Sequence, residues 1–279
     1  MQLTEVKIVA DSSADTLTLG DFPFAAAPLK MISSQKEYVD DANLDVEKML
    51  DELETNTEKV TSSCPSPEDW IQSFGGAKYV FCVTITSGLS GSCNSARLAK
   101  KDYEAQYPDR KVHIVDSLSA GPELLVLIEK IQELILAGKT FEETATAIDE
   151  YQKHTGLVFL LKSVRNLKNN GRVNPIVAKI VGVLGIKIIG EASEKGELKP
   201  LIKHKSERTL IDKLFECMKE KGYAGGKVRI GNCRNEKDAL LLKEQILAKF
   251  PSADVTIYSL RGLCSFYAEI GGVMIGFEY

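Results

Sequence analysis

The amino-acid sequence predicts an α/β protein of two domains: an N-terminal doubly wound, mostly parallel sheet and a C-terminal mixed α+β domain. In the first half of the 279-residue chain, short runs of β-branched and aromatic residues alternate with segments of helical periodicity. This alternation is typical of a parallel sheet covered by helices on both faces. Near residue 155 the regular alternation gives way to hairpin-like patterns. Because the length also favours two domains, we expect domains at 1–155 and 156–279.

Local patterns place the elements of the first half. An apolar run predicts a first strand at 6–10, and a helix is expected at 44–53, where apolar residues recur at helical spacing. Ser66 is a suitable helix N-cap, Pro67 suits the first helical position, and Gly75 suits the helix end. The remaining predicted elements are strands at 78–83 and 112–115 and helices at 93–103 and 124–136.

The second half predicts a different arrangement. After a helix at 141–153 and a strand at 157–161, the sequence Asn-Asn-Gly-Arg at 169–172 is a turn signal that ends in a cation. Strands at 185–191 and 198–205 flank a polar turn and predict a hairpin. The other predicted elements are helices at 210–221 and 239–249, strands at 228–232 and 255–259, and a Gly-rich apolar end at 270–277.

Composition excludes several classes of protein. With 35 basic and 39 acidic residues, the net charge of -4 argues against a nucleic-acid partner. The amino terminus lacks the features of a secretory signal, and the most apolar stretch, 175–190, contains two lysines and is shorter than the roughly 20 residues that span a bilayer. The six cysteines form no Cys-x-x-Cys pair, so we expect reduced thiols, no metal site and a cytoplasmic protein.

Two hydroxyl-rich turns, Thr-Ser-Ser-Cys-Pro-Ser-Pro at 61–67 and Thr-Ser-Gly-Leu-Ser-Gly-Ser at 86–92, precede predicted helices. Unpaired N–H groups at a helix N-terminus favour an anion, and Gly88 and Gly91 allow the backbone to approach a ligand closely. Helix capping alone explains either turn. The pair is more informative, because consecutive βα units bring such turns to one edge of a parallel sheet. We therefore predict a site for a small anionic head group.

The usual catalytic motifs are missing. Asp11 ends the first predicted strand, as in phosphatases of the haloacid dehalogenase type, but Ser13 stands where those enzymes need a second acid. No Gly-x-Gly-x-x-Gly follows that strand, and the complete P-loop motif Gly-x-x-x-x-Gly-Lys-Ser/Thr does not occur. The three histidines lie in predicted strand or helix contexts and are interpreted as structural: His113, His154 and His204. The residues by themselves therefore predict no catalytic group.

Five segments, in order along nearly the whole chain, resemble the DegV family of bacterial fatty-acid-binding proteins, which includes the acyl-carrying subunit of fatty acid kinase. They are Asp-Ser-Ser-Ala-Asp at 11–15, Ser-Ser-Cys-Pro-Ser at 62–66, Ser-Gly-Leu-Ser-Gly-Ser at 87–92, Val-Asp-Ser-Leu-Ser-Ala at 115–120 and Asn-Leu-Lys-Asn-Asn-Gly-Arg-Val at 166–173. The resemblance implies two α/β domains with a lipid tunnel between or beside them.

By position, the resemblance implies that Ser62 and Ser90 hydrogen-bond the carboxylate of a bound fatty acid. It places Ser63, Gly91 and Ser92 close by. Arg172 is expected near the opening, where it would polarise the head group or meet a kinase; a solvated surface arginine is the alternative.

One motif departs from the family pattern. The family's His-x-Gly-Pro-Gly corresponds to Tyr267-Ala268-Glu269-Ile270-Gly271 here. The Tyr267 phenol can still donate a hydrogen bond. Glu269 replaces a glycine, and an unpaired carboxylate near a bound fatty acid anion is expected to repel it. Ser62 replaces threonine, and Cys64 replaces glutamine and so removes an amide donor.

The implied function is that of a non-catalytic carrier, without a cofactor, that holds a long-chain fatty acid and presents its carboxyl to a separate fatty acid kinase subunit. Transient contact with a membrane surface is expected as well. The apolar residues proposed for the tunnel are Ile85, Leu89, Leu118, Leu157, Phe159, Val181, Leu184, Phe266 and Ile275.

Two alternatives stay open at the level of the sequence. The first is an enzyme or sensor for another small anion, with Asp11 and Asp116 in a polar crevice and Tyr267 and Glu269 as proton-transfer groups. The second is a binding module whose pocket is only structural.

Overall fold

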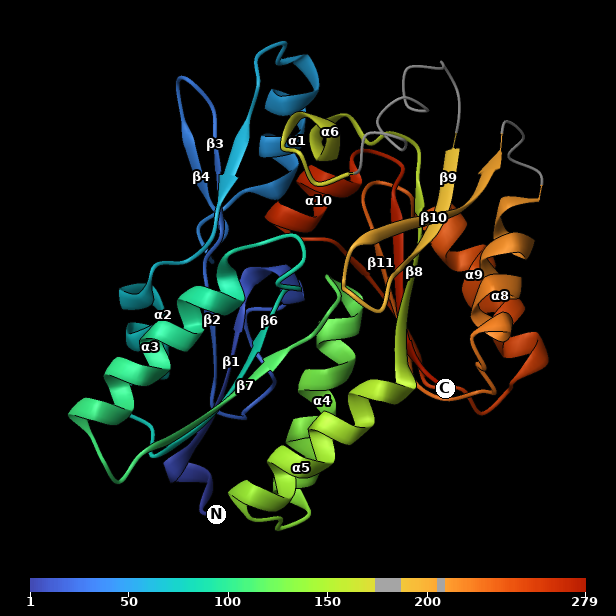
Figure 1. Cartoon of the computed structure of the whole chain (residues 1–279). Helices are drawn as coiled ribbons and strands as arrows, with labels where there is room; N and C mark the ends of the chain where they lie inside the picture. Colours follow the sequence, from blue (N-terminus) through green and yellow to red (C-terminus); the bar gives the residue numbers. More distant parts are fainter. Residues whose placement is uncertain (174–186, 205–208) are drawn as a thin grey trace.

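The computed structural model describes residues 1–173, 187–204 and 209–279. Its first sheet has the order β2-β1-β6-β7, and all three neighbouring pairs are parallel. Helices cover both faces of this sheet (Figure 1), which confirms the predicted doubly wound arrangement. The strands are β1 (Val6–Asp11), β2 (Phe24–Ala27), β6 (Tyr79–Thr84) and β7 (Lys111–Asp116). The helices are α2 (Pro67–Phe74) and α3 (Ser92–Gln106) on one face, and α4 (Pro122–Leu136) and α5 (Phe141–Tyr151) on the other.

Helix α2 shows how the sequence fixes an element. The Ser66 side chain accepts a hydrogen bond from the Asp69 backbone N–H, and the Asp69 carboxylate accepts one from the Ser66 N–H. This capping box satisfies N–H groups that the helix itself leaves unpaired. Gly75 ends the helix in the left-handed conformation, as predicted.

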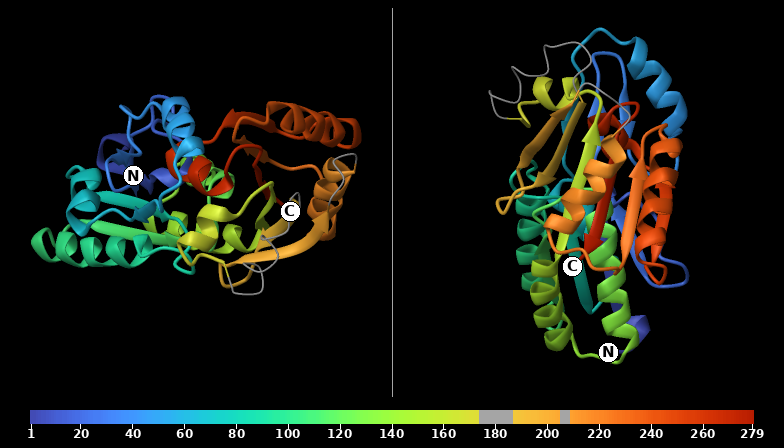
Figure 2. Two further views of the ribbon diagram at one scale, coloured as in Figure 1. Left: turned by 90° about the horizontal axis from the view of Figure 1, so that it is seen from above. Right: turned by 90° about the vertical axis from the view of Figure 1, so that its right-hand side faces the viewer.

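The second sheet has six strands in the order β10-β9-β8-β13-β11-β12. All its pairs are antiparallel except β11–β12, which is parallel. Its strands are β8 (Thr155–Leu161), β9 (Lys187–Ala192), β10 (Leu198–His204), β11 (Val228–Asn232), β12 (Val255–Ser259) and β13 (Val273–Glu278). Helices α8 (Leu210–Glu220) and α9 (Glu236–Lys249) cover one face (Figures 1 and 2).

The opposite face of the six-stranded sheet looks toward the N-terminal half of the chain. Helix α4 packs against β1 and β6 of the first sheet and also against β8, β11 and β13 of the second. The predicted domain boundary falls at the first residue of β8, and the division into domains at that point stays a prediction.

A third, antiparallel sheet of order β4-β3-β5 was not predicted, because each of its strands has only three residues. These strands are β3 (Lys30–Ile32), β4 (Glu37–Val39) and β5 (Thr61–Ser63). The predicted helix α1 (Val46–Thr55) lies beside it, whereas α6 (Arg165–Asn169) and α10 (Gly262–Ala268) were missed as helices. Short 3₁₀ turns complete the described elements: η1 (Leu3–Glu5), η2 (Ser12–Ala14) and η3 (Gln152–His154).

Within the described residues, none of the helices has the length and apolarity that crossing a bilayer requires. All six cysteines are unpaired, and five of them are buried.

Candidate functional site

The first hydroxyl turn is positioned by a different sheet from the one predicted. Its residues Thr61–Ser63 form β5, an edge strand of the three-stranded sheet, rather than lying at the edge of the parallel sheet. The hydroxyl oxygens of Ser62 and Tyr267 share a hydrogen bond of 2.6 Å, although the two residues are 205 positions apart. Helix α10 thereby brings Tyr267 to the serine that the sequence singled out.

Tyr267 is protonated in this setting. Burial raises the pKa of its phenol, while the hydrogen bond with Ser62 and the nearby Arg172 act in the opposite direction. A neutral phenol has one proton to donate. The pair of hydroxyls can therefore offer a hydrogen bond to an anion that enters between them.

The second hydroxyl turn meets the first. A β-carbon at Gly91 would lie 3.4 Å from the Cys64 sulfur, so the two turns lie next to each other there. The Ser95 hydroxyl in the first turns of α3 donates a 2.7 Å hydrogen bond to the carbonyl of Pro65. Ser90 is half-buried, and its hydroxyl accepts a hydrogen bond of 3.2 Å from the Ser92 backbone.

Ser92, by contrast, lies behind the site. Its side chain is fully buried, and its hydroxyl donates a 2.6 Å hydrogen bond to the Asp11 carboxylate. Asp11 also accepts hydrogen bonds from the Ser13 hydroxyl and from the Ile85 backbone. Ser92 therefore anchors the turn to the first strand and does not line the cavity described below.

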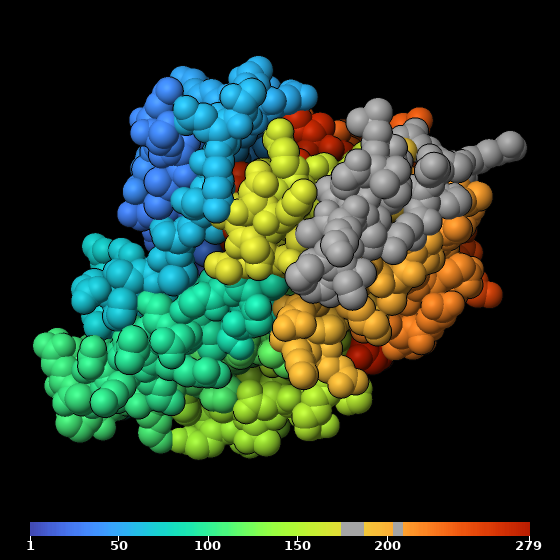
Figure 3. Space-filling view, turned by 45° about the horizontal axis from the view of Figure 1, so that its top comes forward, coloured from blue at the N-terminus to red at the C-terminus, as the bar shows by residue number. Residues whose placement is uncertain are grey.

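Arg172 supplies positive charge at the site. It follows α6, and its backbone N–H donates a 2.8 Å hydrogen bond to the Leu167 carbonyl. The side chain is half-buried and lines the same cavity as Ser62, Ser63 and Ser90. Among the described residues, no carboxylate forms an ion pair with it. In Figure 3 the yellow segment around α6 lies between blue and green segments of the N-terminal half.

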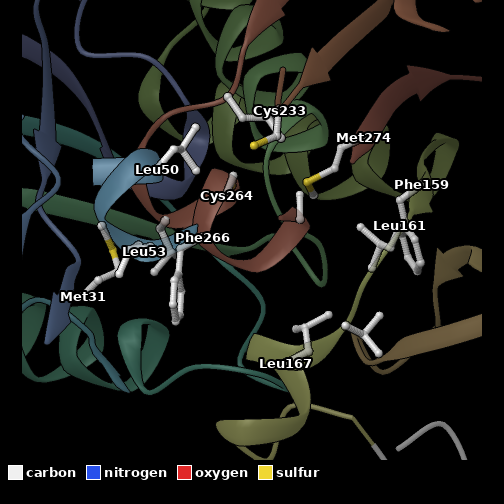
Figure 4. Close-up of a cluster of buried hydrophobic side chains, with 14 of the residues drawn as sticks. Met31, Leu50, Leu53, Phe159, Leu161, Leu167, Cys233, Cys264, Phe266 and Met274 are labelled. Carbon is white, nitrogen blue, oxygen red and sulfur yellow. The ribbon is translucent and has the colours of Figure 1, made fainter. Parts of the chain in front are cut away.

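These side chains surround the mouth of a cavity of about 310 Å³, which lies within the usual size range of small-molecule sites. The residues at its polar end are Ser62, Ser63, Ser90, Gly91, Arg172 and Tyr267. The rest of its wall is apolar or thiol-bearing: Leu29, Cys64, Ile85, Leu89, Ala120, Leu157, Phe159, Leu161, Leu167, Leu198, Leu263, Cys264, Ala268 and Met274. Figure 4 shows four of these lining residues, Phe159, Leu161, Leu167 and Met274, among the buried hydrophobic side chains.

The residues proposed for the tunnel lie in different places in the structure. Four of them line the cavity: Ile85, Leu89, Leu157 and Phe159. Three do not: Leu118 is 37% exposed, Ile275 lies on the other face of β13, and Phe266 packs beside Leu50 and Leu53 (Figure 4). Val181 and Leu184 lie outside the described residues.

The cavity residues that the sequence analysis missed include Leu161 and Met274. In a strand, residues two apart share a face. Leu161 could therefore have been found from Leu157 and Phe159. The signal for Met274 is its cross-strand pairing with Phe159, which the sequence does not display.

The Glu269 carboxylate is not unpaired, which was the condition for the expected repulsion. Its carboxylate accepts a 3.0 Å hydrogen bond from the Asn166 backbone at the start of α6, and it lies 3.7 Å from the Arg165 Nε. It lines a second cavity, of about 280 Å³, between α1, α6 and α10. The Glu269 side chain thus points away from the cavity that Tyr267 lines.

The two aspartates of the alternative hypothesis have structural partners. Asp11 is fully buried, and burial raises the pKa of its carboxyl. Asp116 accepts a 3.0 Å hydrogen bond from the Ser87 backbone. Both therefore hold the 86–92 turn in place, and neither lines the cavity. In the described part of the chain, no cluster of three metal-ligating side chains could hold a metal ion.

The fold and the site together define an α/β protein with a mainly apolar cavity whose mouth carries hydroxyls and one arginine. The chain matches the model described as "Uncharacterised protein, DegV family" over residues 5–279, and it belongs to that family. A DegV domain-containing protein of Streptococcus pneumoniae is 43% identical over 276 residues, which are 98% of this chain and 98% of that protein.

Two solved structures are similar over almost their full lengths. A DegV family protein from Eubacterium eligens loaded with heptadecanoic acid has a TM-score of 0.95 and 40% identity, and the match covers 98% of this chain and 99% of that chain. The B3 protein of the Streptococcus pneumoniae fatty acid kinase (Fak), loaded with linoleic acid, has a TM-score of 0.95 and 42% identity, with the same coverage.

Proposed function

We propose that this protein binds a long-chain fatty acid in the 310 Å³ cavity and presents its carboxyl group to a separate kinase for acyl-phosphate formation. The observation that carries the proposal is the cavity itself, whose mainly apolar lining also includes Ser62, Tyr267, Ser90 and Arg172. An apolar tail and an anionic head are the two chemistries that such a wall and mouth accommodate.

The tail is expected to supply most of the affinity. Burying a saturated chain of roughly 16 carbons is worth on the order of 12 kcal/mol before the costs of association. Each hydrogen bond to the carboxylate adds about 1.5–3 kcal/mol. The hydroxyls of Ser62, Ser90 and Tyr267 would therefore select the head group and its orientation.

Two features support a carrier rather than an enzyme. Asp11 and Asp116 are engaged in the hydrogen bonds that shape the 86–92 turn, so the acids proposed for a catalytic crevice do not reach the cavity. Gly91 at the mouth is exposed and Arg172 is half-buried, which would leave the carboxyl within reach of a phosphoryl donor held by a partner. The S. pneumoniae fatty acid kinase protein named above supports the same role. Loading and release would involve transient contact with a membrane surface.

Mass spectrometry of lipid extracted from the purified protein under denaturing conditions tests the binding directly. We expect a co-purified long-chain fatty acid, and calorimetry with the stripped protein should show binding. Absence of lipid together with absence of calorimetric binding would contradict the proposal.

Head-group recognition needs a separate experiment. Ser90→Ala should reduce the preference for a fatty acid over its methyl ester more than it changes the preference for tail length. If Ser90→Ala bound acid and ester as the unmodified protein does, the role assigned to Ser90 would be wrong.

The kinase step is tested by mixing the loaded protein with the catalytic subunit of a fatty acid kinase and ATP. Hydroxylamine should trap an acyl hydroxamate only when both proteins are present. Formation of the hydroxamate without the partner would show that this chain is itself an enzyme.

A further inference from the structure

The lining of the cavity includes an aromatic ring that lies against a glycine. On the open face of the six-stranded sheet, Met274 of β13 pairs with Phe159 of β8, and Phe159 pairs with Gly190 of β9. Phe159 is only 4% exposed and lines the cavity. Its ring therefore lies between a flexible thioether on one side and a residue without a side chain on the other.

The contact between Phe159 and Gly190 leaves no room for a β-carbon. A β-carbon at Gly190 would lie 2.5 Å from Cζ and 2.6 Å from Cε2 of the Phe159 ring, and 2.7 Å from the Lys199 carbonyl oxygen. Such distances are well below van der Waals contact. Glycine inside a strand weakens the strand and marks a close approach of other atoms. Here the atoms that approach belong to a wall of the proposed ligand site.

We propose that the Phe159–Gly190 pair sets how deep the acyl cavity is, and so which chain lengths the protein accepts; this inference rests on the proposed fatty-acid binding. The ring has the sheet below it, Met274 on one side and the cavity above. Because interiors are close-packed, a ring displaced from Gly190 moves into the cavity. A side chain at position 190 would shorten the space for the tail.

The closed face of the same sheet offers a matched control. Gly156 of β8 pairs with Phe277 of β13, and a β-carbon there would lie 3.4 Å from the Phe277 ring, which is ordinary contact. Gly156→Ala is therefore the same chemical change beside the same kind of ring, on the face away from the cavity.

The experiment measures dissociation constants for saturated fatty acids of increasing length with four variants: Gly190→Ala, Phe159→Leu, the double variant and Gly156→Ala. Gly190→Ala should weaken binding of the longest accepted chain by about tenfold, the equivalent of two buried methylenes, and should affect shorter chains less. Phe159→Leu should shift the preference toward longer chains. The double variant should regain the affinity for long chains, because leucine vacates the space that the new β-carbon needs.

The outcomes separate this inference from the proposed function. If the unmodified protein bound no fatty acid, the function and the inference would both fall. If it bound normally and Gly190→Ala weakened all chain lengths equally without rescue by Phe159→Leu, only the inference would fall, since a shift of β10 at Lys199 would then explain the loss. Should Gly190→Ala fail to fold, an unchanged length preference in Phe159→Leu would be enough to overturn the inference.

Discussion

The two faces of the six-stranded sheet are built from the same strands but have different partners. On the closed face, Val158 and Leu160 of β8 and Ile275 of β13 are completely buried against the layer of α8 and α9. On the open face, Leu157, Phe159, Leu161 and Met274 line the cavity. One face is thus a core that the protein completes itself, and the other is a core that we propose a ligand completes. Alternate residues of one strand can therefore serve stability and binding separately.

The largest expected effect comes from replacing, one at a time, two adjacent leucines of β8 that lie on opposite faces of the sheet. Leu160→Ala should lower the free energy of unfolding by about 2–5 kcal/mol, because the cavity it creates lies in a filled core. Leu161→Ala enlarges a space that already exists, so it should lower stability by roughly 1–2 kcal/mol and should weaken fatty-acid binding. Urea unfolding and calorimetry measure both quantities.

Each of these leucine variants is the control for the other, since they share residue type and strand. Equal losses of stability, or weaker binding in Leu160→Ala than in Leu161→Ala, would break the distinction between the two faces.

The comparison also explains what the sequence could predict. The bounds of several elements were predicted closely, because their apolar pattern specifies the type of element. These are the helices α4 and α5 and the strands at 228–232 and 255–259. The three-residue strands of the small sheet are too short to show a period. The short helix α10 was missed for the same reason, although it carries Tyr267.

The alternation of side chains along a strand does not reveal which face of the strand binds a ligand. Leu157 and Ile275 are both apolar strand residues, yet Leu157 lines the cavity and Ile275 packs against the helical layer. The pairing of β8 with β13 decides this, and that pairing joins residues more than a hundred positions apart. Local patterns and family motifs located the hydroxyl turns, whereas only the tertiary structure shows that Ser62 contacts Tyr267.

A second expected effect concerns ligand binding at the polar end of the cavity. Tyr267→Phe removes the phenol oxygen that shares a hydrogen bond with Ser62. If that phenol donates to the carboxylate, the affinity for a fatty acid should fall by about 1.5–3 kcal/mol, and the affinity for the methyl ester should fall less. Calorimetry with both ligands measures the difference. Equal losses for acid and ester would assign Tyr267 to the apolar wall instead.

A buried acid behind the open face gives a pH-dependent effect. The Asp15 carboxylate accepts a 2.8 Å hydrogen bond from the Arg261 backbone, and a β-carbon at Gly121 would lie 3.3 Å from its Oδ2 and 3.0 Å from the Met274 methyl group. Burial, and to a lesser degree the charge of Asp40, raises the pKa of Asp15 to about 8. The folded protein therefore holds a proton that the unfolded chain releases near pH 4.

The folded state binds this proton more tightly than the unfolded chain does, so protonation of Asp15 stabilises the fold. This stabilisation is fully present below about pH 4 and is lost as the pH rises to about 8. Asp15→Asn is neutral throughout and keeps an acceptor for the Arg261 N–H. The free energy of unfolding of Asp15→Asn, relative to that of the unmodified protein, should therefore increase by up to about 1.4 kcal/mol per pH unit between pH 5 and 8. Urea unfolding across this range measures it, and parallel curves for the two proteins would show that Asp15 does not titrate as described.

The smallest expected effect lies two residues beyond Tyr267. The Glu269 side chain is 11% exposed and that of its partner Arg165 is 52% exposed, so their ion pair is partly screened by water. Glu269→Gln keeps an oxygen for the Asn166 N–H and removes only the charge. We expect a loss of stability below about 1 kcal/mol and an unchanged affinity for fatty acids, because this carboxylate lines the second cavity. A gain in affinity would mean that the Glu269 charge acts on the bound anion across α10, and the cavities on the two sides of that helix would then not be electrostatically independent.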